Sequence, residues 1–152
     1  MIDERNESFK IDAIFKSRWR DPRLSASSLG SSLAGCALKL DDIWNSEVGS
    51  INLRAQPDYL FKKLNVDDDG NVEFYARLQA TLTSNLDLRE FPFDTQHLDI
   101  QLASFNYGPQ DVVFVANEAG TGRLENATLA GWTLLSNTSD ASVTTLKSAN
   151  GV

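Results

Sequence analysis

The chain has 152 residues, of which 41% are hydrophobic and 23% charged, values that are ordinary for one globular domain with a core of its own. Its net charge of −7 excludes nucleic acid as an expected partner, because nucleic acid is bound mainly through lysine and arginine contacts to phosphate. No apolar run approaches the roughly 20 residues that a membrane-spanning helix needs. No signal peptide is recognisable either, so we expect a cytosolic protein or a piece of a larger one. The single cysteine, Cys36, excludes an intramolecular disulfide.

Alternating apolar and polar residues predict β-strands along most of the chain. The clearest alternation spans residues 9–16, 72–83 and 98–103. Shorter apolar runs at 112–115 and 132–135 are typical of more fully buried strands. Turn signals separate these segments, at Asp21-Pro22, Asp69-Gly70, Gly108-Pro109 and Gly120-Thr121-Gly122.

Helical periodicity is scarce. It predicts one or two turns at most, within residues 57–63 or within part of residues 25–39, and the Ser/Gly-rich stretch 25–38 is interpreted as a long loop. Strands joined by short turns indicate an all-β fold of the immunoglobulin-like β-sandwich type. We expect this sandwich in residues 1–135, followed by a polar tail with little fixed structure in residues 136–152.

The acidic stretch "NVDDDGNVE" has two interpretations. Asn65, Asp67 and Asp69 with Gly70 match the first half of an EF-hand calcium loop. The twelfth position holds Ala76, where that loop requires a bidentate glutamate, and no helices are predicted on either side. A hairpin turn with Asp-Gly at its tip is therefore favoured, and no metal site is expected.

No catalytic arrangement is recognisable. The chain has no nucleophile-elbow motif, no glycine-rich phosphate loop and no cluster of metal ligands. His97 is the only histidine, and it stands at the start of a predicted strand, where an exposed position is expected. We therefore expect neither an enzyme nor a cofactor. Trp19 and Trp44, taken singly, are typical of core residues.

Taken together, five ordered segments resemble the extracellular ligand-binding domain of pentameric ligand-gated ion channels, the Cys-loop receptor superfamily. The first two are "FKIDAIFKSRWRDPRL", with Trp19, Asp21, Arg23 and Leu24 at the signature positions, and "LDDIWNSEVGSIN", with Trp44, Glu47 and Asn52 and with Ser46 in place of a proline. The others are "DDGNVEFYARLQATLT", "FPFDTQHLDIQLASFNYG" and "LAGWTLLS", which carries Trp132. Together they extend over residues 2–135.

The resemblance is to a particular branch of this family. Eukaryotic members close the signature loop with two cysteines, whose positions here hold Ser84 and Leu98. Bacterial members keep the Phe-Pro-Phe-Asp turn without the bridge, so the chain resembles a prokaryotic homologue. The resemblance also implies a domain that is incomplete at both ends. The first strand, the N-terminal helix, the last strands and the four-helix channel domain have no counterpart in these residues.

The resemblance implies a small-molecule site between the subunits of a homo-pentamer. One face would contribute Ile51, Phe105 and Tyr107, and the other Ile14, Glu73, Tyr75 and Arg77. A quaternary ammonium group needs several aromatic faces, and isoleucine holds two of the aromatic positions, so we expect no strong acetylcholine-like site. A primary amine, a proton or a divalent cation is compatible with the remaining residues.

The resemblance also implies residues that couple ligand binding to pore opening. They are Asp3, Glu4, Phe91, Pro92, Phe93 and Asp94. The Phe91–Pro92 peptide is expected to be cis, at the end of the sandwich opposite the Asp69-Gly70 turn. There the two phenylalanines would contact the channel domain in the membrane, and Asp94 would face an arginine of that domain. The full-length protein is expected in the cell membrane, with this domain on the extracellular or periplasmic face.

Two alternatives remain open from the sequence. The first is a stand-alone β-sandwich binding module that has the same fold and no channel. The second is an adhesion-type or carbohydrate-binding sandwich, which predicts neither pentamers nor a cis peptide at Phe91–Pro92. Four apolar stretches of about 20 residues encoded downstream of Val152 would favour the channel over the stand-alone module.

Overall fold

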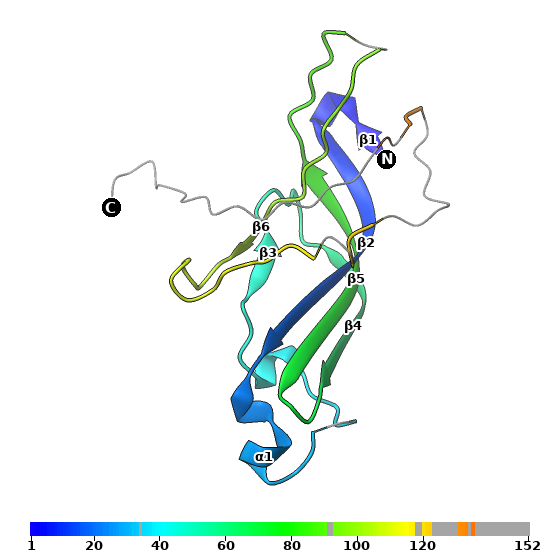
Figure 1. The fold of residues 1–152 in the computed structure, drawn as a ribbon. Coiled ribbons are helices and arrows are strands. Elements are labelled where there is room, and N and C mark those ends of the chain that lie inside the picture. The colour runs from blue at the N-terminus through cyan, green and yellow to red at the C-terminus, as the bar shows by residue number, and fades with distance from the viewer. Residues whose placement is uncertain (34, 91–92, 118–119, 123–130, 134, 136–152) are drawn as a thin grey trace.

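The computed structural model describes residues 1–33, 35–90, 93–117, 120–122, 131–133 and 135. They form two antiparallel sheets, one four-stranded in the order β1-β2-β5-β4 and one two-stranded, β3-β6 (Figure 1). The strands are β1 (Ile2–Asp3), β2 (Ser8–Arg20), β3 (Val48–Ser50), β4 (Asp58–Val66), β5 (Asn71–Thr83) and β6 (Leu102–Ser104). The helices are α1 (Ala26–Leu29) and three single turns of 3-10 helix, η1 (Glu4–Asn6), η2 (Pro22–Leu24) and η3 (Leu40–Asp42). The predicted all-β sandwich is confirmed.

The long strands β2 and β5 form the centre of the larger sheet. They pair antiparallel over their full lengths, from Ser8 opposite Thr83 to Arg20 opposite Asn71. Because side chains alternate between the faces of a strand, the apolar residues of both runs point to one face. On β5 this face carries the residues Val72, Phe74, Ala76, Ala80 and Leu82, all of them buried. The period-two pattern of the sequence therefore identifies the core.

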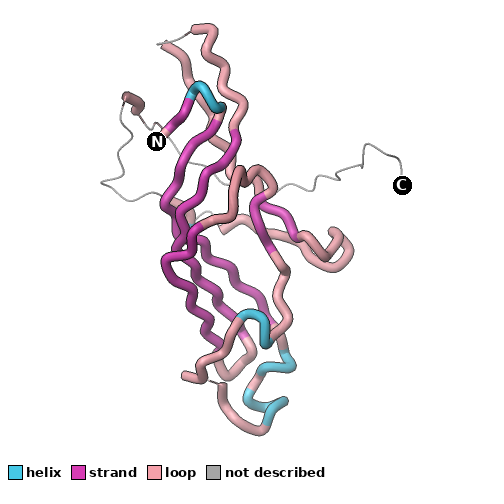
Figure 2. Tube along the Cα trace, turned by 180° about the vertical axis from the view of Figure 1, so that it is seen from behind, coloured by secondary structure: helices cyan, strands magenta, loops and turns pink. Residues whose placement is uncertain are grey.

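The smaller sheet covers this inner face. Leu53, which follows β3, forms a β-bridge with Leu82 of β5. The Trp19 ring on β2 meets the Trp44 ring, which precedes β3, edge to face with 6.4 Å between centroids. Figure 2 shows the same arrangement from behind, with the short strands beside the long ones. The β-bridge and the tryptophan pair thus join the smaller sheet to β5 and to the inner face of β2.

The β4–β5 hairpin closes with the predicted Asp-Gly turn. One Asp67 carboxylate oxygen accepts from the backbone N–H of Asp69 at 3.0 Å and of Asn71 at 2.9 Å. Gly70 has a φ of +79°, which favours glycine. Its carbonyl oxygen accepts from the N–H of Asp21 at 2.8 Å, which ties the turn to the end of β2. In the structure Asp67 therefore serves as a turn-stabilising residue, as the hairpin interpretation requires.

Two helical predictions had different outcomes. The turn expected within residues 25–39 is confirmed by α1, which Ser25 caps by accepting from the N–H of Ser28. The helix expected within residues 57–63 is wrong, because this segment belongs to strand β4 and pairs with β5. Tyr59, Leu60 and Phe61 favour a pleated strand once a long partner is available.

Two strand predictions need correction. The strand expected over 98–103 is reduced to β6, Leu102–Ser104, because its partner β3 is equally short. The strand expected over 112–115 is wrong. The segment has no regular structure, and Val113 and Val115 are 66% and 85% exposed. Within the run 132–135, residue 134 lies outside the described residues, as does the whole predicted tail 136–152.

The two ends of the sandwich carry different features. The hairpin turn and α1 lie at one end, and the loop after β5 projects from the other, beside β1 (Figure 1). Phe93 lies in this projecting loop, at the end opposite Asp69-Gly70. Phe91 and Pro92, with the predicted cis peptide, lie outside the described residues. In the part of the chain that the structure describes, no helix is long and apolar enough to cross a membrane.

Candidate functional site

Four of the predicted ligand-binding residues lie together on the outer face of the larger sheet. Glu73, Tyr75 and Arg77 alternate with the buried residues of β5, so their side chains point away from the core. Ile14 of β2 stands directly opposite Arg77 in the register and is 62% exposed. The antiparallel pairing thus brings residues from two distant parts of the chain onto one continuous surface.

The Glu73 carboxylate on this face is already bound by its own chain. It lies 2.6 Å from Arg18 Nε and 3.8 Å from Lys16 Nζ, and it accepts from the Tyr75 hydroxyl at 2.9 Å. The Tyr75 hydrogen bond, followed by the positive charges of Arg18 and Lys16, holds the pKa of Glu73 below its ordinary value. Lys16 Nζ also lies 4.7 Å from the centroid of the Tyr75 ring. Both groups that would attract a cationic ligand here have intramolecular partners.

The neighbouring charge on this face is paired as well. Arg77 donates two hydrogen bonds to the Asp12 carboxylate, at 2.9 and 3.0 Å, and Gln79 donates a third at 3.2 Å. The Arg77 hydrogen bond and then that of Gln79 lower the pKa of Asp12. Ile14 is therefore an exposed apolar side chain between two satisfied polar clusters.

The other predicted ligand-binding residues surround the small sheet. Phe105 follows β6, is 64% exposed, and lies with its ring against Gly49 of β3. A Cβ atom at Gly49 would come within 2.5 Å of the Phe105 ring, so this placement requires glycine. Tyr107 packs on Trp44 with 5.6 Å between ring centroids. Ile51 follows β3 directly and is 42% exposed.

The two sets lie on opposite sides of the larger sheet. Tyr107 contacts Trp44, and Trp44 contacts Trp19 on the inner face of β2. Glu73 and its neighbours are on the outer face of the same sheet. A ligand in contact with Tyr107 cannot also contact Glu73 within a single chain, because the larger sheet separates these two residues.

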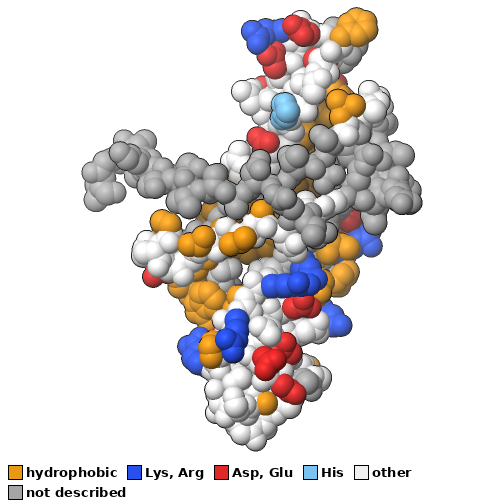
Figure 3. Space-filling view, viewed as in Figure 1, with side chains coloured by type: hydrophobic (Ala, Val, Ile, Leu, Met, Phe, Trp, Pro, Cys, Tyr) orange, Lys and Arg blue, Asp and Glu red, His pale blue; other side chains and the backbone are white. Residues whose placement is uncertain are grey.

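The projecting loop carries the predicted coupling residues. Phe93 is 91% exposed, and Figure 3 shows hydrophobic surface at the tip of this end of the molecule. The amide of Gln96 donates to Asp94 Oδ2, whereas Asp94 Oδ1 is buried and has no hydrogen-bond partner among the residues that the structure describes. A buried carboxylate oxygen without a donor leaves an acceptor available for a group from outside this chain.

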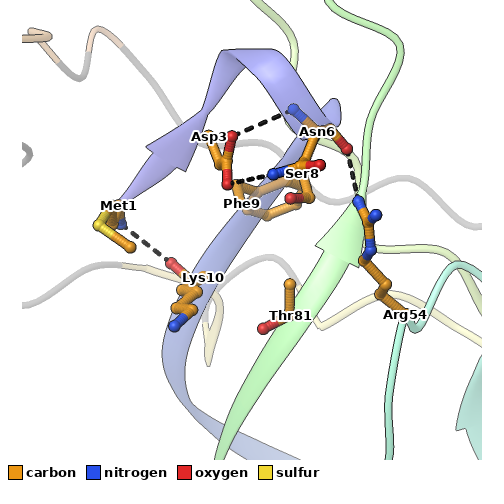
Figure 4. A pocket seen from close by; sticks show the side chains of 8 residues that line it. All are labelled: Met1, Asp3, Asn6, Ser8, Phe9, Lys10, Arg54 and Thr81. Carbon is orange, nitrogen blue, oxygen red and sulfur yellow. Dashed lines mark hydrogen bonds between the residues drawn. The ribbon is translucent and has the colours of Figure 1, made fainter.

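The predicted coupling residues Asp3 and Glu4 lie at the same end. Asp3 accepts from the backbone and side-chain N–H groups of Asn6, at 3.1 and 2.9 Å, and the side-chain bond is the largest cause of its lowered pKa. Arg54 donates to the Asn6 carbonyl oxygen at 2.6 Å. Asp3, Asn6 and Arg54 border an open cleft of about 250 Å³ (Figure 4). Asp3 therefore stabilises the local turn, and Glu4 follows it at the start of η1.

The structural signature residues connect the sheets and the turns. Asp21 is buried and forms a bidentate pair with Arg23, at 2.9 and 2.7 Å, which lowers the pKa of Asp21. Trp19 packs edge to face on Trp44, which is 36% exposed and so is not the core residue that the sequence suggests. Trp132 is partly buried. The signature positions identified from the sequence are thus mainly structural.

The comparison with known proteins decides the family. The family described as the neurotransmitter-gated ion-channel ligand binding domain matches residues 1–150. The chain belongs to this family. The predicted resemblance is therefore confirmed, and the matched family is one of ligand-binding domains of channels, not of enzymes.

This ligand-binding domain is also similar to a curated prokaryotic protein, the "Proton-gated ion channel" of Gloeobacter violaceus. The two are 28% identical over 131 residues, which cover 86% of this chain and 36% of the relative. The chain thus spans about a third of the length of that channel.

Sequence reasoning missed several residues of this ligand-binding domain. Lys16 and Arg18 stand opposite Tyr75 and Glu73, a relationship that becomes visible only once the β2–β5 register is known. Asn52 was recognised only as the end of a signature, yet its side chain makes four hydrogen bonds. Among the described residues, no group of three or more His, Cys, Asp or Glu side chains could hold a metal ion.

Proposed function

We propose that this chain is the ligand-sensing region of a homo-pentameric channel on the extracellular or periplasmic face of a membrane. The observation that carries the proposal is the separation of the predicted ligand-binding residues onto opposite sides of one sheet. Ile51, Phe105 and Tyr107 on one copy would meet Ile14, Tyr75 and Arg77 on the next. A site made in this way exists only between subunits.

The ligand that we propose is the proton. A cationic amine would have to displace Lys16 from the Tyr75 ring and compete with Arg18 for Glu73, since both contacts exist within the chain. A divalent cation would need several carboxylates together, and the described residues hold no such group. A proton requires no cage, and the similar Gloeobacter channel is named as proton-gated.

The response would be transmitted through the projecting loop. Phe93 is almost fully exposed, and the buried Asp94 Oδ1 has no donor within the described part of the chain. Together they offer an apolar contact and a carboxylate acceptor to a channel domain that carries a basic side chain. Asp3 and Glu4, at the same end, would lie beside this contact.

The experiment is a current measurement on the full-length parent channel in oocytes. We expect currents that rise as the external pH is lowered, and no current when a primary amine is applied at neutral pH. An amine-activated channel that ignores pH would refute the proton as ligand. A reading frame that ends without membrane-spanning segments would refute the channel and leave the stand-alone module.

The position of the site can be tested separately by cross-linking. In a Cys36→Ser background, Ile14→Cys and Phe105→Cys together should give disulfide-linked multimers, because the two side chains lie on facing surfaces of neighbouring subunits. Ile14→Cys alone is the matched control and should remain uncross-linked. Absence of multimers from the double variant would contradict a site between these two surfaces.

A further inference from the structure

Asn52 makes a set of hydrogen bonds that joins three segments of the chain. Its Nδ2 donates to the carbonyl oxygens of Thr83 at 2.9 Å and Asp99 at 2.8 Å. Its Oδ1 accepts from the backbone N–H of Gln101 at 3.1 Å and from the hydroxyl of Ser50 at 2.9 Å. The side chain therefore connects the ends of β3 and β5 with the segment that leads into β6.

These contacts use the full hydrogen-bonding capacity of an asparagine side chain. The amide nitrogen has two N–H donors and the oxygen has two lone pairs, and each has a partner here. Aspartate has the same size but would place a carboxylate against two carbonyl oxygens. The Asn52 backbone adds to the junction, since its carbonyl oxygen accepts from the Thr83 N–H at 2.8 Å.

The partners of Asn52 stand at the base of the projecting loop. Thr83 is the last residue before residues 84–98, and Asp99 is the first residue after them. Within the loop, the Ser84 hydroxyl donates to the His97 carbonyl oxygen at 3.0 Å. The outgoing and the returning halves of the loop, its two legs, therefore meet at this bond. One Asn52 amide group thus bonds to both legs, just below that contact.

We propose that Asn52 is a positioning residue that holds the two legs of the loop 84–98 together and joins them to the segment carrying Ile51. Its amide crosses the base of the loop that presents Phe93 and Asp94. The importance of this loop for gating rests on the proposed function, whereas the closure of its base rests on the Asn52 contacts alone.

Limited digestion with trypsin tests the closure. Arg89 lies in the loop with an 86% exposed side chain, and the Arg89–Glu90 bond is a trypsin site. Loss of the two Nδ2 hydrogen bonds in Asn52→Ala should speed cleavage at this bond about tenfold, because local opening controls proteolysis. Asn52→Asp, which keeps the size of the side chain, should do the same. The control is Asn65→Ala at an exposed asparagine of β4, which should leave the rate unchanged.

A rescue separates loop closure from general destabilisation. In a Cys36→Ser, Asn52→Ala background, Ser84→Cys and Leu98→Cys should form a disulfide, because the legs meet at Ser84 and His97. The oxidised protein should regain the slow cleavage at Arg89, and the reduced protein should not. Continued fast cleavage in the oxidised protein, or thiols that do not couple, would overturn the proposal.

Recordings from the full-length channel distinguish this proposal from the proposed function. If Asn52→Ala opens the loop and also shifts the pH for half-maximal current, both stand. If the loop opens and gating is unchanged, the Asn52 closure stands and the coupling role of the loop fails. An unchanged cleavage rate in both Asn52 variants would refute the closure, whatever the channel does.

Discussion

The hydroxyl of Ser84 donates a hydrogen bond to the carbonyl oxygen of His97, 3.0 Å away, where the loop carrying Phe93 and Asp94 leaves the sandwich. A second link lies further along the loop, where Gln96 Oε1 accepts from the Asp87 N–H at 3.1 Å and Gln96 Nε2 donates to the Asp87 carbonyl oxygen at 2.6 Å. The resemblance to disulfide-bridged members of this family implies that Ser84 stands at the position of one of their two cysteines. In this chain, hydrogen bonds close the loop in place of the covalent link.

Ser84→Ala should therefore lower the free energy of unfolding by about 1 kcal/mol, the usual contribution of one intramolecular hydrogen bond. Urea denaturation measures it. The control is Ser31→Ala, at an exposed serine in the loop after α1, which should change the midpoint little. Equal urea midpoints for the two variants would show that the Ser84 hydrogen bond does not contribute to the free energy of unfolding.

Gly70→Ala should destabilise the hairpin more than a comparable change elsewhere. Gly70 has a φ of +79°, and an added Cβ would lie 2.4 Å from the carbonyl oxygen of Asp21. Gly35 has the same φ, and no atom of the described residues lies within 4 Å of an added Cβ, so Gly35→Ala carries only the cost of positive φ, about 1 kcal/mol. Thermal denaturation of both variants measures the difference, which is the cost of the steric contact. If the two variants have equal melting temperatures, the close contact between Gly70 and the Asp21 carbonyl oxygen does not exist in solution.

The sequence predicted the parts of the fold in which one segment carries its own signal. The alternation over residues 72–83 identified β5 and its buried face, because every second side chain is apolar over the whole strand. Asp69-Gly70 identified the hairpin turn for an equally local reason. Strand β4 was mistaken for a helical turn, because its short apolar run acquires a pleated conformation only by pairing with β5.

The candidate site shows the same division. The positions of Ile14, Glu73 and Tyr75 on one face follow from strand parity, which a sequence shows directly. The ion pairs of Glu73 with Lys16 and Arg18 cannot be predicted from strand parity, because they depend on the β2–β5 register. The four bonds of Asn52 depend on three segments that meet only after folding. No sequence pattern around residue 52 therefore predicts these four hydrogen bonds.

The Asp21–Arg23 pair should make stability depend on pH. Asp21 is buried, and its Arg23 hydrogen bonds lower its pKa in the folded state. A lowered folded-state pKa contributes stability above the ordinary aspartate value of about 3.9, and this contribution is lost as the pH falls through the lowered pKa. Asp21→Asn should therefore cost about 1–3 kcal/mol at pH 7 and much less at pH 2. Denaturation of both proteins at the two pH values measures this, and a cost that is equal at both would refute the linkage.

Glu73→Gln should lower the free energy of unfolding only slightly, and the loss should depend on the salt concentration. The carboxylate is a third exposed, so its ion pairs with Arg18 and Lys16 together should contribute less than about 1 kcal/mol, with a smaller contribution at high salt. Because the folded pKa of Glu73 is lowered, that contribution is present above the ordinary glutamate value and is lost as the pH falls. Denaturation midpoints at about 0.1 M and 1 M NaCl measure it. The control is Glu4→Gln at the opposite end of the sandwich. A Glu73 effect that does not decrease with salt would show that hydrogen bonding by Tyr75, not charge, dominates this cluster.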